Sequence, residues 1–372
     1  MRTPSGPLGR RQRKTVLGID IGTHAIRVVQ VGPYRGRPAV YNFARASTPP
    51  GAFREHEPVD VEALGEVLKD LLAERNIRRP RCVVTGVNSR RAVLRRAVFP
   101  RMSDEEFRQA LKWEAENYLP IPVEEAVIDF QRLPEERDRS TPGPGRMQVL
   151  LVASYRELVE RYRALCAAAG LELDIVEVDC LAQWRALAAL NLVDARAQLT
   201  TLVVDMGEEA TRIALYRRGV FVTLRHLPLG GAYLTRALQD RLGVSFGTAE
   251  ELKGTHGLIS EKRADVAEVL TDALERVYEE LLRLIRQLLL REGRADPVAL
   301  FFIGGGAAGL QGFSEFVTHR HRMLAEVDIP PEAVQVVDLA AAAALAPWME
   351  RNREFFTGEY TTALGMALRS PG

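Results

Sequence analysis

The stretch Gly18-Ile-Asp20-Ile-Gly22-Thr23 decides the fold, because an apolar run ends there in a turn that carries both an acid and a glycine. The same order of strand, aspartate and glycine returns at Val204-Asp205-Met-Gly207, and a third apolar run ends at Gly304-Gly305-Gly306. An Asp-x-Gly turn sets backbone N–H groups beside a carboxylate, which suits a phosphate chain with a magnesium ion between acid and phosphate. Two such turns facing each other predict a clamp for a nucleotide.

The composition is that of an ordinary soluble globular protein. Its 372 residues, 47% apolar and 27% charged, suffice for two domains, so a core needs neither disulfides nor a structural metal. The formal net charge of +1 argues against nucleic acid as an electrostatic partner. Cys82, Cys166 and Cys180 lack metal-ligand spacing and are predicted to be buried thiols in a reducing compartment.

No stretch approaches the roughly 20 apolar residues that a membrane helix needs. We therefore expect a cytoplasmic protein without a direct membrane span. Residues 1–13 combine prolines and glycines with a basic cluster at Arg10, Arg11 and Arg13, and are predicted to form a disordered basic tail. Binding of that tail to a membrane surface is the weaker alternative, since stable anchoring usually takes a second signal.

Two halves of the chain have the same predicted order of elements. Residues 15–45 are predicted to form a meander of three strands, followed by an amphipathic helix and a buried strand at 81–87. Residues 199–227 repeat the meander, and helices at about 230–241, 247–255 and 262–291 precede the strand before Gly304. The repetition predicts a duplicated two-domain α/β fold that closes on a cleft.

The duplication leaves residues 90–178 unexplained. Their pattern predicts a strand, a helix from Asp104 to Tyr118, two strands around a Pro- and Gly-rich loop, and then a further helix and strand. We predict an inserted α+β subdomain that offers a surface to a partner, with Trp113 and Tyr118 either in its core or at that surface. The predicted domains are 14–89 with 179–198, the insertion at 90–178, and 199–372 with a helical subdomain at about 231–291.

Several segments together resemble a known family. They are Leu17-Gly-Ile-Asp-Ile-Gly-Thr23 with Arg27, Ala110-Leu-Lys-Trp-Glu-Ala-Glu-Asn-Tyr-Leu-Pro-Ile-Pro122 with Asp129-Phe-Gln131, Leu227-Pro-Leu-Gly-Gly-Ala-Tyr-Leu-Thr235, Ile303-Gly-Gly-Gly306, and Thr362-Ala-Leu-Gly-Met-Ala-Leu368. The chain resembles the actin-like (ribonuclease-H-like) nucleotide-binding superfamily and, within it, the PilM family of type IV pilus assembly proteins, relatives of the cell-division protein FtsA. The stretch from Trp113 to Pro122 distinguishes PilM-like chains, because sugar kinases and chaperones share the Asp-x-Gly turns.

The resemblance, which spans roughly residues 14–369, implies an actin-like fold and a site for ATP and Mg²⁺. The implied phosphate-binding residues are Asp20, Gly22, Thr23 and Arg27 in the first loop and Asp205 and Gly207 in the second, with Asp20 and Asp205 as metal ligands. Arg27 lies where the family tends to have lysine, so a planar fork replaces a compact ammonium.

The resemblance implies three further groups in the site. Gly304, Gly305 and Gly306 would let the backbone approach the adenosine and α-phosphate. Glu250 and Lys253, three residues apart on one helix face, would hold the ribose and adenine edge, although a solvated ion pair is the alternative. Asp179 falls where relatives orient the attacking water and is the candidate catalytic residue, with an ordinary helix N-cap as the alternative.

The second loop departs from the family pattern at Glu208 and Glu209, where small or hydroxyl-bearing residues are usual. Two carboxylates beside a triphosphate repel it unless they point away or hold the metal. We therefore expect ATP binding with weak or no ATPase activity.

The resemblance implies a cytoplasmic ATP-binding assembly protein of a type IV pilus machine, peripheral to the inner membrane. Its partner would be the cytoplasmic tail of a PilN-type inner-membrane protein, bound in a nucleotide-dependent way at the insertion, with self-association as a further expectation. An FtsA-like filament protein and a type II secretion component are alternatives, but the chain ends at Gly372 directly after its last apolar helix. A small-molecule kinase is less favoured, because residues 60–100 offer no cluster for a substrate.

Overall fold

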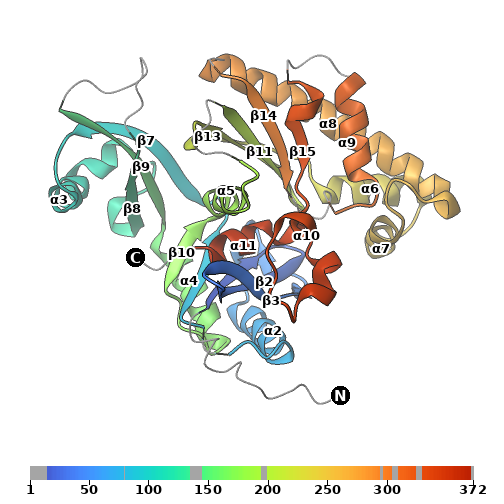
Figure 1. The fold of residues 1–372 in the computed structure, drawn as a ribbon, viewed down its shortest axis with the longest axis horizontal. Coiled ribbons are helices and arrows are strands. Elements are labelled where there is room, and N and C mark those ends of the chain that lie inside the picture. Colours follow the sequence, from blue (N-terminus) through green and yellow to red (C-terminus); the bar gives the residue numbers. More distant parts are fainter. Residues whose placement is uncertain are drawn as a thin grey trace. The chain divides into compact units, whose positions relative to one another are not determined.

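A computed structural model describes residues 15–78, 80–134, 145–193, 199–293, 296–303, 309–323 and 329–369. The chain divides into two compact units, each with a five-stranded sheet (Figure 1). Unit 1 comprises Met1–Val193, Ala343–Arg353 and Thr362–Gly372, and unit 2 comprises Asp194–Ala342 and Glu354–Thr361. The predicted basic tail at 1–13 lies outside the described residues.

The sheet of unit 1 has the strand order β10-β6-β1-β2-β3. Its strands are β1 (Val16–Ile21), β2 (Ala25–Tyr34), β3 (Arg37–Ser47), β6 (Cys82–Val87) and β10 (Ile175–Val178). The first three strands form an antiparallel meander, whereas β6 pairs in parallel with both β1 and β10. The carboxyl ends of β10, β6 and β1 therefore meet at one edge of the sheet, which is where α/β proteins bind ligands.

The C-terminal helix packs closely against unit 1 at two glycines. The helices beside the sheet are α2 (Val61–Glu74), α4 (Arg156–Ala168), α5 (Asp179–Ala189) and α11 (Thr361–Ala367). A Cβ on Gly18 of β1 would lie 2.0 Å from the carbonyl oxygen of Ala363 in α11. A Cβ on Gly365 of α11 would lie 1.8 Å from the carbonyl oxygen of Ala182 in α5. The end of the chain thus belongs to unit 1, whereas the sequence assigned all of 199–372 to the second domain.

The insertion is a separate antiparallel sheet with the strand order β7-β9-β8, packed against one helix. Its elements are β7 (Ala92–Pro100), α3 (Asp104–Glu114), β8 (Ala126–Arg132) and β9 (Arg146–Tyr155). A capping box between Ser103 and Glu106 starts α3, and the rings of Phe99, Phe107 and Phe130 meet edge to face in the core. Trp113 is 84% exposed, so it lies at the surface of the insertion and not in its core.

The insertion is shorter than predicted, because residues 156–178 belong to the main body of unit 1. Strand β10 pairs with β6 of the five-stranded sheet. Helix α4 packs on α2, where a Cβ on Gly65 would lie 2.5 Å from the Cβ of Ala168. The boundary at residue 178 was wrong because a long-range strand pairing, which no local pattern reveals, decides it.

The sheet of unit 2 repeats that of unit 1 strand for strand. Its order is β13-β12-β11-β14-β15, with β11 (Thr200–Met206), β12 (Thr211–Arg217), β13 (Val220–Leu227), β14 (Val298–Ile303) and β15 (Val334–Val336). Here too an antiparallel meander is followed by two parallel strands. The duplicated actin-like α/β fold that the sequence predicts is confirmed.

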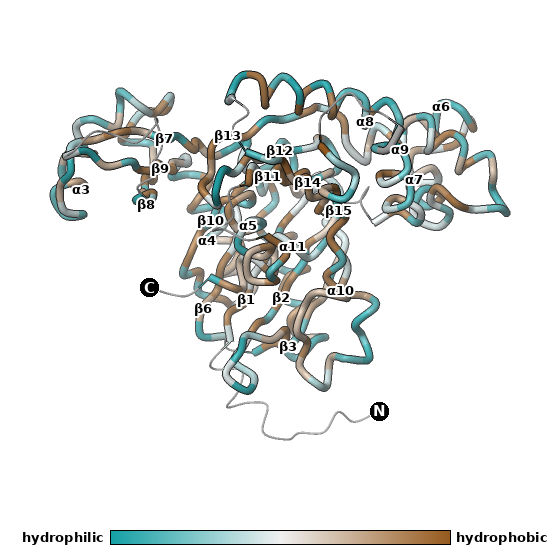
Figure 2. The backbone as a smooth tube through the Cα atoms, turned by 45° about the horizontal axis from the view of Figure 1, so that its top comes forward, coloured by the Kyte–Doolittle hydropathy of each residue, from teal (hydrophilic) through white to brown (hydrophobic). Residues whose placement is uncertain are grey.

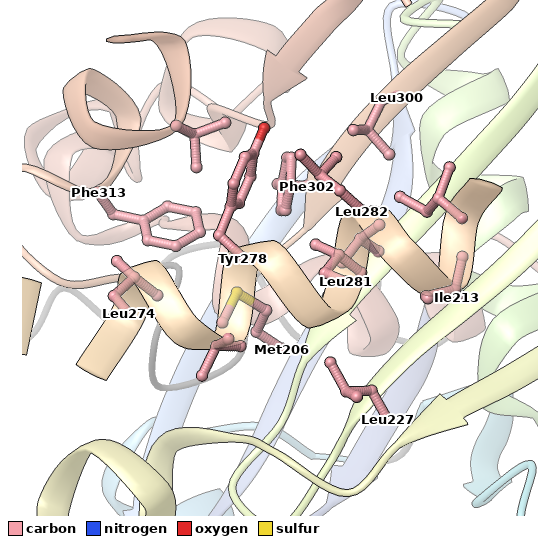
Figure 3. Close-up of a cluster of buried hydrophobic side chains, with 14 of the residues drawn as sticks. Met206, Ile213, Leu227, Leu274, Tyr278, Leu281, Leu282, Leu300, Phe302 and Phe313 are labelled. Atoms are coloured by element: carbon pink, nitrogen blue, oxygen red, sulfur yellow. The ribbon is translucent and has the colours of Figure 1, made fainter. Parts of the chain in front are cut away.

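A long amphipathic helix covers the sheet of unit 2. The helices are α6 (Gly231–Leu242), α7 (Phe246–His256), α8 (Ala264–Glu292) and α9 (Phe313–Met323). Hydrophobic and hydrophilic residues alternate around α8 along its length (Figure 2). Its buried side chains, including Leu274, Tyr278 and Leu281, share one hydrophobic cluster with Phe302 of β14 and Phe313 of α9 (Figure 3). No helix in the described parts of the chain is long and apolar enough to cross a membrane.

Shorter elements complete the structure. They are β4 (Phe53–Arg54), β5 (Glu57–Pro58), α10 (Leu339–Ala342) and single 3-10 turns at Ala115–Asn117, Val123–Glu125, Glu261–Arg263, Pro331–Ala333, Glu350–Phe355 and Gly358–Tyr360. Cys82, Cys166 and Cys180 are buried and free, as predicted. Burial raises the pKa of the Cys166 thiol to about 12, which makes it an inert core residue.

Candidate functional site

The β1–β2 hairpin holds a carboxylate and a guanidinium beside a turn glycine. Asp20 and Arg27 are opposite each other in the strand register, and the Nη1 of Arg27 lies 3.8 Å from the Oδ2 of Asp20. The turn closes through the N–H of Gly22, which donates to the carbonyl of Ala25 at 3.1 Å. A Cβ on Gly22 would lie 3.8 Å from the same Nη1. Thr23 follows Gly22 in this turn and is half-buried.

The β11–β12 hairpin of unit 2 repeats this arrangement. Asp205 and Arg212 are opposite each other in the register, and the Nη2 of Arg212 forms an ion pair with the Oδ2 of Asp205. The N–H of Gly207 donates to the carbonyl of Ala210 at 3.0 Å. A Cβ on Gly207 would lie 3.9 Å from the Nη2 of Arg212. Each turn glycine therefore has a guanidinium beside it.

The two hairpins also share a sequence pattern that the sequence analysis missed. Asp20-Ile-Gly-Thr-His-Ala-Ile-Arg27 and Asp205-Met-Gly-Glu-Glu-Ala-Thr-Arg212 have aspartate, glycine, alanine and arginine at the same spacings. Arg27 entered the predicted site through the family resemblance, and Arg212 did not enter it. A comparison of the two halves of the chain with each other contains the signal that would have found it.

The other predicted phosphate-binding glycines cannot be placed. Gly304, Gly305 and Gly306 lie outside the described residues. The strand that precedes them, β14, ends at Ile303, which is in register with Asp205 of β11. Their assignment therefore stays a prediction.

Glu250 and Lys253 form a buried cluster and not a solvated pair. The Nζ of Lys253, a residue only 2% exposed, lies 2.7 Å from the Oε2 of Glu250 and 2.8 Å from the Oγ1 of Thr235. It also donates to the carbonyl of Gly231 at 3.3 Å. The pair thus fastens α7 to the first turn of α6. The alternative of a solvent-exposed helix pair is wrong because tertiary packing encloses the ammonium.

The second turn is joined to this cluster through the start of α6. The N–H groups of Gly231 and Ala232 donate to the carbonyls of Gly207 and Glu208, each at 2.9 Å. A Cβ on Gly231 would lie 3.2 Å from a carboxylate oxygen of Glu208 and 3.4 Å from the Nζ of Lys253. The carboxylate of Glu208 and the ammonium of Lys253 thus both border Gly231, and this nearby cation offsets part of the expected repulsion between Glu208 and a phosphate.

Asp179 is the first residue of α5 and is 5% exposed. Its Oδ1 accepts from the N–H of Ser89 at 3.1 Å and from the N–H of Cys180 at 2.6 Å. Val178, not Asp179, is the N-cap residue, so Asp179 ties the segment after β6 to the start of α5. Because β10, β6 and β1 are adjacent and parallel, Asp179 and Asp20 lie at the same edge of the sheet.

A tyrosine that the sequence analysis did not single out belongs to this edge. Tyr162 of α4 is fully buried, and among the described residues its hydroxyl has no hydrogen-bond partner. Burial raises the pKa of Tyr162 most, and the nearby charges of Asp20 and Asp179 raise it further. The edge of the sheet in unit 1 that carries Asp20 and Asp179 therefore also has a buried polar group, the hydroxyl of Tyr162.

The residues of each hairpin, taken by itself, fit a magnesium–phosphate group. Each turn supplies a carboxylate oxygen, which is the ligand type that Mg²⁺ prefers, and Mg²⁺ is commonly bound through one or two carboxylates together with phosphate oxygens. Each turn also supplies a guanidinium, which binds phosphate through paired hydrogen bonds. A Cβ at Gly22 would meet no atom nearer than 3.4 Å, so a methyl group fits there without displacing a neighbour.

Comparison with known proteins decides the family. The family described as Type IV pilus assembly protein PilM matches residues 18–371. The chain belongs to this family. Among solved structures, a chain of a PilM-PilN type IV pilus biogenesis complex is 27% identical with a TM-score of 0.77, and the match covers 96% of this chain and 100% of that one.

More distant relatives agree with the fold. The cell division protein FtsA of Bacillus subtilis is 22% identical over 226 residues, which are 54% of this chain and 50% of FtsA. FtsA of Pseudomonas aeruginosa is 23% identical over 222 residues, 55% of this chain and 50% of that protein. This chain thus spans half or less of the curated relatives that it matches. A further solved structure is that of the ethanolamine utilization protein EutJ from Carboxydothermus hydrogenoformans, which is 19% identical with a TM-score of 0.56. The match covers 100% of this chain and 91% of the EutJ chain.

Proposed function

We propose that this protein is a cytoplasmic ATP-binding assembly protein of a type IV pilus machine, held at the inner membrane through a partner. The observation that carries the nucleotide part is the pair of hairpins, each with an aspartate and an arginine in register beside a turn glycine. Membership of the PilM family supports the pilus part.

The residues of the two turns would share the work of binding Mg²⁺-ATP. Asp20 and Asp205 would take the metal or its water shell, and the N–H groups and guanidinium beside Gly22 would take phosphate oxygens. The bound metal neutralises phosphate charge. Lys253 and Glu250, fixed against Thr235 by hydrogen bonds of 2.8 and 2.5 Å, would present a rigid surface to the ribose and adenine edge.

We propose weak or no ATP turnover. Asp179 is the candidate for positioning an attacking water, yet its Oδ1 already accepts two backbone N–H groups. Those bonds hold the carboxylate in place and make it a positioning group and not a mobile base. Steady-state phosphate release from the purified protein tests this. A rate of about 1 s⁻¹ or more, the low end for typical enzymes, would contradict weak turnover.

The partner would be the cytoplasmic tail of a PilN-type inner-membrane protein. The supporting relative is a chain of a PilM-PilN complex, and the support within this chain is apolar surface on the insertion. Trp113 is 84% exposed on α3, and Val98 and Val127 are 42% and 38% exposed. Their strand neighbours Ala97, Phe99, Ala126 and Ile128 pack in the core under α3, so Val98 and Val127 lie on the opposite face of the sheet. Trp113 and the two valines therefore lie on different faces of the insertion. We propose the face with Trp113 for the tail, because an apolar groove can bind a short peptide with useful affinity.

A pull-down with the cytoplasmic tail of a PilN-type inner-membrane protein from the same organism tests the partner and its dependence on nucleotide. We expect more binding with a non-hydrolysable ATP analogue than without nucleotide, and less binding for Trp113→Ala and Lys112→Glu. Both side chains are exposed, so both variants should fold normally.

Two further comparisons make the partner test specific. Arg108→Glu is a poorer choice than Lys112→Glu, because the guanidinium of Arg108 stacks 5.5 Å from the ring of Phe130 and supports the core. Lys262→Glu is the matched control, since it reverses an exposed charge in unit 2. Loss of binding for Lys262→Glu with normal binding for both insertion variants would move the docking site to unit 2.

A further inference from the structure

Unit 2 contains an arginine, Arg212, that matches Arg27 of unit 1 in spacing, strand register and approach to the turn glycine. Arg27 and Arg212 follow their aspartates by the same spacing and stand opposite those aspartates in the register. Their guanidinium nitrogens would lie 3.8 and 3.9 Å from a Cβ on the turn glycine. Both side chains are largely buried, at 10% and 18% exposure.

We propose that Arg212 binds a phosphate group at the second turn, as Arg27 is proposed to do at the first. This inference rests on the proposed function. In each turn the carboxylate and the guanidinium neutralise each other, and a magnesium–phosphate group offers each of them its preferred partner. Each aspartate would hold the metal in place of its guanidinium partner, and each arginine would bind a phosphate oxygen in place of its carboxylate partner.

Lys253, the other buried cation near the second turn, is committed to structure. Its ammonium lies within 3.3 Å of three protein oxygens, on Glu250, Thr235 and Gly231, and Glu208 lies on the other side of Gly231. A phosphate that took Lys253 would leave these buried acceptors without their donor, which is costly. Arg212 pairs with Asp205, and its guanidinium borders the turn glycine Gly207, so it lies nearer to a phosphate bound at the second turn.

A purely structural role for the Asp205–Arg212 pair is the competing explanation. A buried ion pair contributes little net stability, because desolvation of two charges offsets their attraction. A structural pair would leave nucleotide affinity unchanged when it is altered in a folded protein. Nucleotide affinity therefore separates the two explanations, and stability alone does not.

The test is the equilibrium affinity of the full-length protein for Mg²⁺-ATP, measured by calorimetry for the wild type, Arg212→Lys, Arg27→Lys and Arg217→Lys. Lysine keeps the positive charge but cannot form the bidentate hydrogen bonds of a guanidinium group. We expect Arg212→Lys and Arg27→Lys each to weaken binding by about tenfold or more, the range of a lost charged hydrogen bond. Arg217, at the far end of β12 and bonded to the carbonyl oxygen of Gly293 at 2.7 Å, is the matched control and should leave binding unchanged.

The outcomes separate this inference from the proposed function. A wild type that does not bind ATP would refute the proposed function and the inference with it. A wild type that binds, with loss for Arg27→Lys and wild-type affinity for Arg212→Lys, would overturn the inference alone. If Arg212→Lys does not fold, two other variants are compared. One carries Asp205→Asn alone, and the other carries both Asp205→Asn and Arg212→Gln, so that both side chains of the pair are neutral. A further loss of affinity in the double variant supports the inference, and equal affinities overturn it.

Discussion

The β1–β2 and β11–β12 hairpins have the same backbone and the same four key residues, but their surroundings differ. The first turn is held by Thr48 at the end of the meander, whose hydroxyl donates to the carbonyl of Gly22 at 2.7 Å. The second turn is held by the start of α6, with Gly231 as a donor to Gly207. The duplicated halves have thus kept the same turn, which is held by different neighbouring elements in each unit. The second turn is tied to a buried charge cluster, and we expect it to be the more rigid of the two.

The largest effect on stability should come from removing Lys253, the buried cation close to the second turn. Lys253→Met leaves the carboxylate of Glu250 and the hydroxyl of Thr235 without their buried donor. We expect the free energy of unfolding to fall by about 3 to 5 kcal/mol, as when one partner of a buried ion pair is removed. Chemical denaturation measures it, with the exposed Lys262→Met as a control that should change little. Equal stabilities would show that the cluster does not hold the second turn.

Glycine substitutions sharpen the contrast between the turns. A Cβ on Gly230 would lie 2.4 Å from the carbonyl oxygen of Gly207, so Gly230→Ala should destabilise the protein by about 1 to 3 kcal/mol through overpacking. A Cβ on Gly22 would meet no atom nearer than 3.4 Å, so Gly22→Ala should keep the stability but weaken ATP binding. Thermal melting and calorimetry on the same samples measure both quantities. A stable Gly230→Ala variant, or a Gly22→Ala variant that binds ATP normally, would contradict this assignment.

The smallest effect concerns the acidic residues of the second turn. Glu209 is exposed and Glu208 lies near Lys253. Glu209→Ser should therefore strengthen ATP binding modestly at low salt, and the gain should shrink as salt screens it. Glu208→Gln should change affinity less, because the charge that it removes is already compensated. The reverse order of effects would mean that Glu208 faces the phosphates.

The sequence predicts most of the two sheets and their turns, but few of the long-range contacts that surround them. The apolar runs and the Asp-x-Gly turns predict both sheets, because strand periodicity and turn chemistry are local properties. The boundary of the insertion and the return of α11 to unit 1 depend on contacts between distant residues, such as Gly18 with Ala363. No window of sequence reports such contacts.

For the candidate site too, some residues could be predicted from the sequence and others could not. Within each hairpin the predicted aspartate lies close to its turn glycine, Asp20 near Gly22 and Asp205 near Gly207, and their role in binding a nucleotide stays a prediction. Lys253 was open to two interpretations because helical spacing does not show whether a side chain is buried. Arg212 was missed for another reason, since its signal is a repeat within the chain and not a family motif.

The most direct test of the central claim is calorimetric titration of the full-length protein with Mg²⁺-ATP, for the wild type, Asp20→Asn and Asp205→Asn. Asparagine keeps the size of the side chain and removes the charge that would bind the metal. If both hairpins bind the metal–phosphate group, the wild type binds ATP and each variant binds it more weakly, with the difference shrinking when Mg²⁺ is omitted. A wild type that does not bind ATP, or two folded variants with wild-type affinity, would contradict the account.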